Sequence, residues 1–285
     1  MTILVTGRDG QLAQSLAERG GDRVRLVGRP VLDLAVAGSA RAAILAARPT
    51  LVVNAAAFTA VDLAETEEAA AHRINAAAAG EVAAAAAELG VPVIQISTDY
   101  VFDGQATAPI AETAATNPIN AYGRTKLAGE VAVRAANPDH AILRTSWVIS
   151  PFGKNFVRTM VDLGRSRDRL TVVGDQVGNP TSALDLADAI LLIARRWASG
   201  DRTGMGETYH LVGNGVASWA DLAAAVQTEA GTGSTIVPIT TAEWPTPAAR
   251  PVYSVLDTAK FTRDFGHTLP DWRLSLSPIV ARLIA

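Results

Sequence analysis

The feature that most constrains this fold is an alternation of short aliphatic runs with longer helical patterns along the first half of the chain. The short runs are rich in β-branched residues and are typical of buried parallel strands. Such alternation predicts βαβ units, hence an α/β, Rossmann-type doubly wound parallel sheet with helices on both faces. Strands are expected at Thr2–Thr6, Arg23–Val27, Leu51–Asn54, Val91–Ser97 and Ala141–Arg144, and helices at Gln11–Arg19, Ser39–Ala47, Glu67–Leu89 and Ala121–Ala136.

The second half is less regular and contains most of the prolines. One amphipathic helix, expected at Ala183–Trp197, can return to the sheet. We therefore expect two units. Residues 1–149 together with the helix at 183–198 form a sheet domain, and residues 150–182 and 199–285 form a smaller C-terminal lobe.

Composition excludes several classes of protein. The net charge is −3 with no basic tract, so neither nucleic acid nor an anionic membrane surface is an expected partner. The chain has no cysteine, which excludes disulfides and thiolate chemistry, and its four histidines are scattered and suggest no metal cluster. The first ten residues do not form a signal peptide, and no uncharged apolar run is long enough to span a bilayer. The expected location is cytoplasmic.

A glycine-containing turn, TGRDGQLA at 6–13, follows the first expected strand. Gly7 permits a tight turn, and Gly10 lets the backbone approach a pyrophosphate. The helix that follows, beginning with Gln11 and Leu12, offers free N–H groups and the positive end of its dipole to that anion. Asp9 is an unusual neighbour for a phosphate. This context predicts binding of NADPH or NADH.

The next two strands end in further candidate cofactor residues. Arg29 stands where NAD-selective sites carry an acidic residue, which favours a 2′-phosphate and hence NADPH, although a solvated surface arginine explains it equally well. Asp33 and Leu34 could lie against adenine or form a turn before a helix. Three small residues after the third strand leave room for the cofactor or simply pack tightly: Ala55, Ala56 and Ala57. The sheet domain is thus the expected dinucleotide-binding domain, and the lobe the substrate-binding one.

Tyr122 and Lys126 stand four residues apart and share one face of a predicted helix. Hydride reduction of a ketone leaves an alkoxide that must gain a proton. A phenol can donate it, and a nearby ammonium lowers the phenol pKa and can also hold the nicotinamide ribose. Thr98 ends a buried strand, and its hydroxyl can orient the substrate carbonyl. We predict Thr98, Tyr122 and Lys126 as catalytic residues.

These motifs resemble the extended short-chain dehydrogenases and, more narrowly, the dTDP-4-dehydrorhamnose reductases. The resemblance spans essentially the whole chain, and its most specific segments are STDYVFDG at 97–104 and PTPAARP at 245–251. It implies NAD(P)H-dependent reduction of the C4 keto group of dTDP-4-dehydro-β-L-rhamnose to dTDP-β-L-rhamnose, with Tyr122 as the proton donor. Some members have magnesium at a dimer contact, so a homodimer is a family expectation, but no pattern here secures the metal.

The resemblance also implies a pocket for the sugar nucleotide. An arginine and aromatic rings suit the two phosphates and the flat thymine of a dTDP ligand. Each pocket residue has a structural alternative: core packing, a helix cap, buried aromatics, a backbone hydrogen bond at a strand end, or an arginine paired with a surface carboxylate. Besides Thr98 and Tyr122, the implied pocket residues are Val61, Asp62, Asp99, Tyr100, Trp147 and Arg250.

Two other functions remain open from the sequence. A sugar-nucleotide dehydratase or epimerase has the same fold, but a dehydratase needs a second acid next to the Thr-Asp pair, where this chain has Tyr100. The other is a regulatory subunit that binds cofactor without turnover and stabilises a partner enzyme. The intact set of Thr98, Tyr122 and Lys126 argues against that function.

Overall fold

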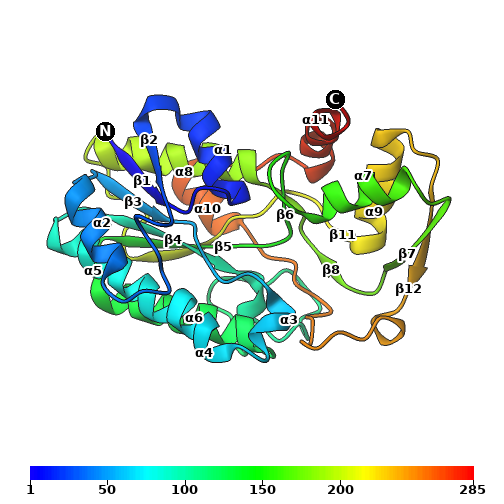
Figure 1. Cartoon of the computed structure of the whole chain (residues 1–285), viewed down its shortest axis with the longest axis horizontal. Helices are drawn as coiled ribbons and strands as arrows, with labels where there is room; N and C mark the ends of the chain where they lie inside the picture. Colours follow the sequence, from blue (N-terminus) through cyan, green and yellow to red (C-terminus); the bar gives the residue numbers. More distant parts are fainter.

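A six-stranded parallel sheet forms the centre of the computed structural model, which describes residues 1–285 (Figure 1). Its strands are β1 (Ile3–Thr6), β2 (Val24–Val27), β3 (Leu51–Asn54), β4 (Val93–Thr98), β5 (His140–Thr145) and β10 (Glu207–His210), in the order β10-β5-β4-β3-β1-β2. The predicted fold class is confirmed, and the five predicted strands are present. The strand order reverses between β1 and β3, and doubly wound sheets bind ligands outside the carboxyl ends of their strands at such a point.

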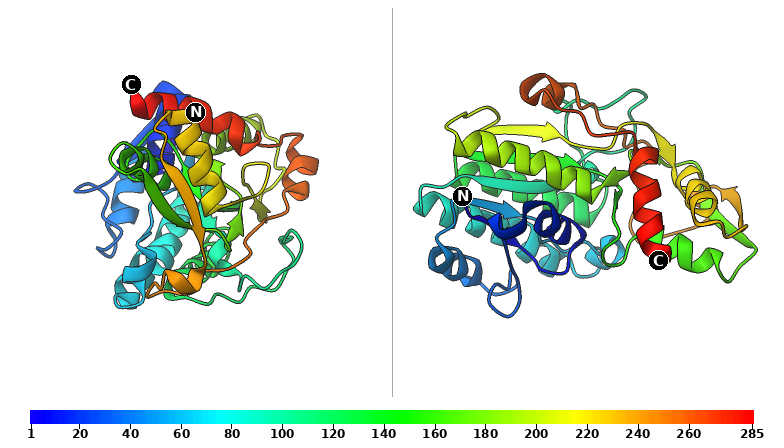
Figure 2. Two further views of the ribbon diagram at one scale, coloured as in Figure 1. Left: turned by 90° about the vertical axis from the view of Figure 1, so that its right-hand side faces the viewer. Right: turned by 90° about the horizontal axis from the view of Figure 1, so that it is seen from above.

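Helices cover both faces of the sheet (Figures 1 and 2). Side chains alternate along each strand, so that Ile3 and Val5 pack in one layer and Leu4 in the other. The layer that contains Leu4 is built entirely from aliphatic side chains, many of them alanine, which lets its helices approach the sheet closely. The other layer also contains aromatic side chains, namely Trp197, Tyr209, Phe261 and Phe265. One layer contains α1 (Gln11–Gly20), α8 (Ala183–Ala198) and α10 (Ala259–Phe265), and the other contains α2 (Ser39–Ala47), α5 (Ala78–Glu88) and α6 (Ala121–Ala136).

The long helix expected at 67–89 is interrupted by a π-helical turn. It consists of α4 (Glu68–His72), the turn at Arg73–Ala77, and α5. Asn75 in this turn accepts a hydrogen bond from the Phe58 N–H (2.8 Å) and donates one to the Thr125 hydroxyl (3.0 Å). The turn therefore links the loop after β3 to α6.

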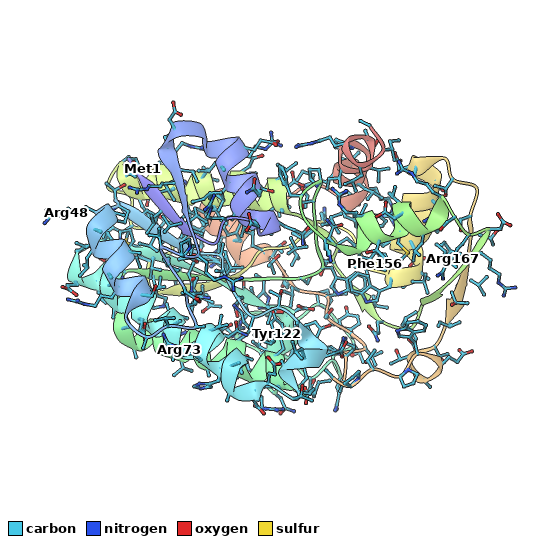
Figure 3. All side chains as sticks on the ribbon, viewed as in Figure 1. Met1, Arg48, Arg73, Tyr122, Phe156 and Arg167 are labelled. Atoms are coloured by element: carbon cyan, nitrogen blue, oxygen red, sulfur yellow. The ribbon has the colours of Figure 1, made fainter.

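The smaller lobe lies to the right in Figure 1, and Figure 3 labels Phe156 and Arg167 there. Its core is separate from the two sheet layers and includes the buried Trp272 and Leu276. No helix of the structure combines the length and apolar character that crossing a bilayer requires. The elements of the lobe are β6 (Val148–Ile149), α7 (Phe156–Gly164), β7 (Arg169–Val173), β8 (Val177–Gly178), β9 (Thr181–Ser182), β11 (Ala217–Ser218), α9 (Trp219–Ala230), β12 (Thr235–Ile239) and α11 (Trp272–Ile284).

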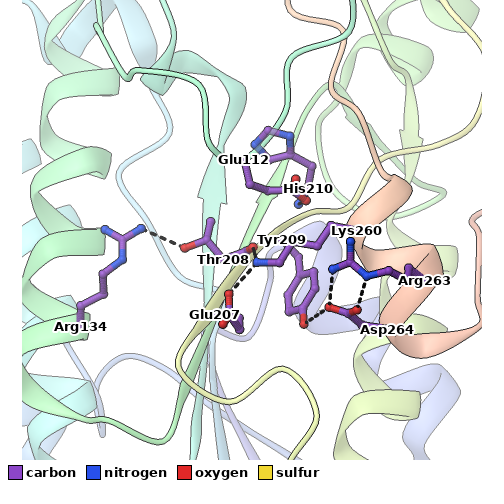
Figure 4. Close-up of polar contacts among 9 residues, drawn as sticks. All are labelled: Glu112, Arg134, Glu207, Thr208, Tyr209, His210, Lys260, Arg263 and Asp264. Atoms are coloured by element: carbon purple, nitrogen blue, oxygen red, sulfur yellow. Dashed lines mark hydrogen bonds and ion pairs between the residues drawn. The ribbon is translucent and has the colours of Figure 1, made fainter.

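The sixth strand, β10, comes from a segment that the sequence analysis placed in the smaller lobe. It pairs in parallel with β5, and Tyr209 lies opposite Leu143. Figure 4 shows how side chains attach this strand to its neighbours. The buried Tyr209 donates its hydroxyl hydrogen to Asp264 on α10 (2.8 Å), and Arg134 on α6 donates to the Thr208 hydroxyl (2.9 Å). One segment of the second half of the chain thus completes the sheet.

Candidate active site

A cleft of about 880 Å³ runs along the carboxyl ends of the sheet strands and reaches the smaller lobe. Every predicted catalytic and cofactor residue lines it, as do four of the six implied pocket residues. Asp62 and Arg250 are the two that do not. The predicted residues that line the cleft are Gly7, Gly10, Gln11, Leu12, Arg29, Asp33, Leu34, Ala55, Ala56, Ala57, Val61, Thr98, Asp99, Tyr100, Tyr122, Lys126 and Trp147.

The glycine turn forms a cradle between β1 and α1. Gly7 has φ +93°, a conformation that favours glycine, and a Cβ there would lie 3.5 Å from the Cβ of Ala56. Gly10 precedes α1, no side chain caps this helix, and the space beside Gly10 is open. The first N–H groups of α1 are therefore available to an anion, which fits a dinucleotide diphosphate. Gln11 accepts a hydrogen bond from the Ser150 hydroxyl (2.9 Å), which joins this cradle to the lobe.

A buried row of polar side chains fixes the strand ends beneath the cradle. The Thr6 hydroxyl donates to the Asn54 side chain (2.6 Å), whose amide donates to Gln95 (2.7 Å). Thr6 also accepts a hydrogen bond from the Ala56 N–H (3.1 Å). These bonds cross from the ends of β1 and β3 to the middle of β4, so the three strands keep one relative position.

The N-terminus of α6 carries Tyr122 into the cleft, and Figure 3 shows this residue between the helices below the sheet and the smaller lobe. Asn120 caps the helix by accepting from the Gly123 N–H (2.8 Å), and its amide donates to the Ala249 carbonyl (2.8 Å). A Cβ on Gly123 would lie 2.1 Å from the Tyr100 carbonyl oxygen. A glycine between the tyrosine and the lysine thus lets α6 approach the Tyr100 backbone closely. The Tyr100 and Tyr122 rings then meet edge to face, with centroids 5.6 Å apart.

The structure does not show the predicted lowering of the Tyr122 pKa by Lys126. The Lys126 ammonium donates to the Ile96 carbonyl (2.7 Å), and burial lowers the pKa of this lysine to about 8. The enclosed position of the Tyr122 phenol raises its pKa to about 12, against the opposing effect of a hydrogen bond with Thr98. Desolvation therefore dominates both titrations, and the tyrosine keeps its proton at neutral pH.

Asp99 is a buried carboxyl group next to this pair. The Thr98 hydroxyl donates to its Oδ1 atom (2.9 Å), while the buried Oδ2 atom has no partner. Burial raises the pKa of Asp99 to about 6, although the hydrogen bond from Thr98 opposes the shift. A carboxyl group that titrates near neutrality at the edge of a cleft is a common feature of functional sites.

Glu130 lies one helical turn beyond Lys126, and the sequence analysis did not single it out. Arg144 on β5 donates to both of its carboxylate oxygens (2.8 Å each), and the Ser97 hydroxyl donates to Oε1 (2.6 Å). Burial would raise the pKa of Glu130, but the hydrogen bonds and charge of Arg144 outweigh it and keep that pKa below its usual range. The spacing of four residues from Lys126 is the signal that could have identified it.

Asp62 and Arg250 pair with each other instead of lining the cleft. Asp62 belongs to α3 (Val61–Ala64), and its Oδ2 atom accepts from the Arg250 guanidinium at 2.8 Å. The other oxygen accepts from the Ala248 N–H (3.2 Å). The hydrogen bond from Arg250 lowers the pKa of Asp62. The pair joins the loop region after β3 to the 245–251 segment.

Trp219 also lines the cleft, and it is not among the residues predicted from the sequence. It is the first residue of α9, where a capping box formed by Ser218 and Asp221 fixes the start of the helix. Its indole stacks on that of Trp147.

Comparisons with known proteins agree with this geometry. The model of the RmlD substrate binding domain family matches residues 1–284. The chain belongs to the dTDP-4-dehydrorhamnose reductase family. A dTDP-4-dehydrorhamnose reductase from Sinorhizobium fredii is 45% identical over 290 residues, covering 100% of this chain and 98% of that protein. One from Burkholderia thailandensis is 41% identical, with all of both chains covered.

Solved structures from this reductase family superpose along the full chain. The enzyme from Clostridium acetobutylicum has a TM-score of 0.92 and 40% identity, with 100% of both chains covered. The enzyme from Bacillus anthracis, solved in complex with NADP, has a TM-score of 0.90 and 33% identity, with 99% of both chains covered. Family membership therefore rests on sequence and on fold alike.

Proposed function

We propose that this chain reduces the C4 keto group of dTDP-4-dehydro-β-L-rhamnose to dTDP-β-L-rhamnose with NADPH or NADH, in deoxysugar nucleotide biosynthesis. The observation that carries the proposal is a single cleft that combines the glycine cradle with Thr98, Tyr122 and Lys126. The names of the full-length relatives, and NADP in the Bacillus anthracis enzyme, support the same reaction. A cytoplasmic location remains an expectation from the sequence, and a homodimer remains one from the family resemblance.

The geometry supports the following catalytic roles. The reduced cofactor, when bound, supplies a hydride to the carbonyl carbon. As the carbonyl π bond breaks, Tyr122 transfers its phenolic proton to the oxygen, so the product is a neutral alcohol. A phenol with a pKa of about 12 holds its proton until a strongly basic oxygen develops beside it. Thr98, which hydrogen-bonds with Tyr122, would orient the substrate oxygen toward this proton.

Lys126 would support this step by holding the cofactor. Its pKa of about 8 leaves it mostly protonated at neutral pH. The ammonium has three donors, of which one is used by the Ile96 carbonyl, so the others are free for ribose hydroxyls.

Several residues would recognise the sugar nucleotide. Val61, Tyr100 and Trp147 line the cleft beside the catalytic tyrosine and would contact the sugar. Asp99 would bind a sugar hydroxyl through its unpaired oxygen. Arg250 would pair with the diphosphate by exchanging its Asp62 carboxylate for a phosphate, an acceptor of the same charge type.

The decisive experiment measures cofactor oxidation by absorbance at 340 nm with dTDP-4-dehydrorhamnose as substrate. We expect one equivalent of NADPH oxidised for each equivalent of sugar nucleotide converted, and no oxidation without the sugar nucleotide. A dehydratase or epimerase would recycle its cofactor and show no net oxidation. A regulatory subunit would bind cofactor without turnover. Either result would refute the proposal.

A further inference from the structure

We infer that Gln11 is a positioning residue for the sugar-nucleotide side of the cleft. Its side chain connects the segment that carries Trp147 to α1, the helix whose first turn receives the cofactor diphosphate. A cofactor bound at the glycine cradle therefore tightens the binding of the sugar nucleotide. This inference rests on the proposed function, which requires both ligands in one cleft. The sequence analysis assigned Gln11 to cofactor binding alone.

Gln11 takes part in both halves of the cleft. It is the first residue of α1, whose first N–H groups have no side-chain cap and are available to the diphosphate. Both ends of its side-chain amide reach the segment that enters the smaller lobe. The nitrogen donates to the Val148 carbonyl of β6 (3.2 Å), and the oxygen accepts from the Ser150 hydroxyl directly after β6 (2.9 Å). One side chain thus holds this segment against α1.

Ser150 anchors the same segment to the smaller lobe. It is fully buried, and its hydroxyl oxygen accepts from the Phe152 N–H (3.1 Å). Its carbonyl accepts from the side-chain amide of Asn155 (2.9 Å), the residue that caps α7. A buried polar group that loses its partner is costly, so these bonds keep the segment in one conformation. The position of Gln11 is therefore transmitted to the lobe.

Trp147 lies directly before the residues that Gln11 holds. Its carbonyl accepts from the Thr181 N–H (3.1 Å), and its indole stacks on Trp219. The backbone of Trp147 is thus supported from the lobe by Thr181 and from α1 through the neighbouring Val148. Loss of the second support leaves the residue that would contact the sugar held from one side only.

The connection links the two binding events energetically. A diphosphate on the first N–H groups of α1 fixes the first turn of this helix, and the side chain of Gln11 with it. Conformational freedom that is lost in this step is no longer lost when the sugar nucleotide binds against Trp147, so the second ligand binds more tightly. Coupling of this kind is reciprocal, so the sugar nucleotide tightens cofactor binding by the same factor.

The test measures the affinity for dTDP-β-L-rhamnose by isothermal titration calorimetry, with and without saturating ADP-ribose. This probe carries the diphosphate but has no nicotinamide ring that could touch the sugar. We expect ADP-ribose to tighten dTDP-β-L-rhamnose binding to the wild type by at least about 5-fold, the lower end of typical couplings. Gln11→Leu should reduce this ratio to less than about 2-fold. In the 340 nm assay, its effect should fall on the KM for the sugar nucleotide more than on kcat.

Gln11→Leu should fold, because the Ser150 hydroxyl can then donate to the Phe152 carbonyl, which lies 3.0 Å away. Ser150→Ala is a second variant, which leaves the cofactor helix untouched and removes one of the two hydrogen bonds. It should lower the same ratio. A ratio that stays at the wild-type value in both variants would overturn the inference, as would a wild-type ratio near one.

Glu18→Gln is the matched control. Glu18 also connects α1 to the smaller lobe, through Arg282 of α11 (2.9 Å), but this pair is partly exposed and lies about two helical turns beyond the cradle. Water can replace the lost partner, so the ratio should keep its wild-type value. An equal loss of coupling in Glu18→Gln would contradict the assignment to Gln11. Failure of the wild type to bind dTDP-β-L-rhamnose or NADP⁺ would refute the proposed function, and this inference with it.

Discussion

The indole rings of Trp147 and Trp219 are stacked almost parallel, with centroids 3.6 Å apart and planes inclined by 8°. Trp147 has φ +45°, in the left-handed region that large side chains rarely occupy. Gly178 faces it, because a Cβ there would lie 2.8 Å from Cε2 of Trp147. Trp219 and Gly178 of the smaller lobe thus hold Trp147 in an unusual backbone conformation at the cleft.

Trp219→Leu should release Trp147 from this position. We expect the KM for the sugar nucleotide to rise by about 10-fold, the cost of roughly one aromatic pair, with the Kd for NADP⁺ unchanged. Coupled indoles give a paired positive and negative band in the far-ultraviolet circular dichroism spectrum, and this band pair should vanish. Trp244→Leu, which removes an exposed tryptophan, should keep it. A couplet that survives in Trp219→Leu would show that another pair produces it.

Tyr122→Phe should remove the proton donor and keep the shape of the cleft. We expect kcat to fall by about 10²- to 10⁴-fold, the usual contribution of a general acid, while the Kd for NADP⁺ stays within about 2-fold. The measurement is the 340 nm assay beside calorimetric cofactor binding. Tyr253→Phe is the control, since the Tyr253 ring packs outside the cleft and its hydroxyl can be removed without loss of a contact in the site. Reduction at the wild-type rate by Tyr122→Phe would show the catalytic assignment to be wrong.

Glu130→Gln should destabilise the folded state strongly, because it leaves the buried Arg144 guanidinium without its carboxylate. Breaking a buried pair from one side costs about 3–5 kcal/mol of unfolding free energy. Urea denaturation followed by circular dichroism measures it. Glu68→Gln breaks the exposed pair with Arg124 and should cost less than about 1 kcal/mol. A similar loss of unfolding free energy in both variants would mean that burial does not determine how much the Glu130–Arg144 pair stabilises the fold.

Asp99→Asn should change the pH dependence of stability in a predictable direction. The folded-state pKa of Asp99, about 6, lies above its ordinary value, so its protonated form favours folding. The resulting stability is fully present below about pH 4 and is lost as the pH rises through 6. The variant does not suffer this loss. Its free energy of unfolding minus that of the wild type should therefore be about 1 kcal/mol higher at pH 8 than at pH 5, so the variant is relatively more stable at pH 8. A difference that does not change between these pH values would contradict the buried titration.

The sequence predicted the sheet well because local patterns encode it. Runs such as Leu51–Asn54 are too apolar and β-branched for any other element, and the helices at Ser39–Ala47 and Ala121–Ala136 have the predicted bounds. The π-helical turn at Arg73–Ala77 was not predicted, because an alanine-rich pattern predicts an uninterrupted helix. The strand Glu207–His210 escaped because it is short and half polar.

In the candidate site too, local patterns predicted some features, and others depend on contacts between distant parts of the chain. Spacing of four residues placed Tyr122 and Lys126 on one helix face, and strand ends located the cofactor residues along the cleft. The pairing of Asp62 with Arg250 joins residues 188 positions apart, which no local pattern reveals. Burial is likewise a property of the folded chain, so the titration of Tyr122 could not be derived from its lysine neighbour alone.

The late position of β10 has a consequence for synthesis on the ribosome. The edge of β5 has no partner until residues 207–210 have emerged, although all five preceding strands are already available to pair. An unpaired strand edge is a template for association with other chains. Nascent chains that stall before this segment should therefore aggregate, and completion of the sheet depends on translation proceeding more than sixty residues beyond β5.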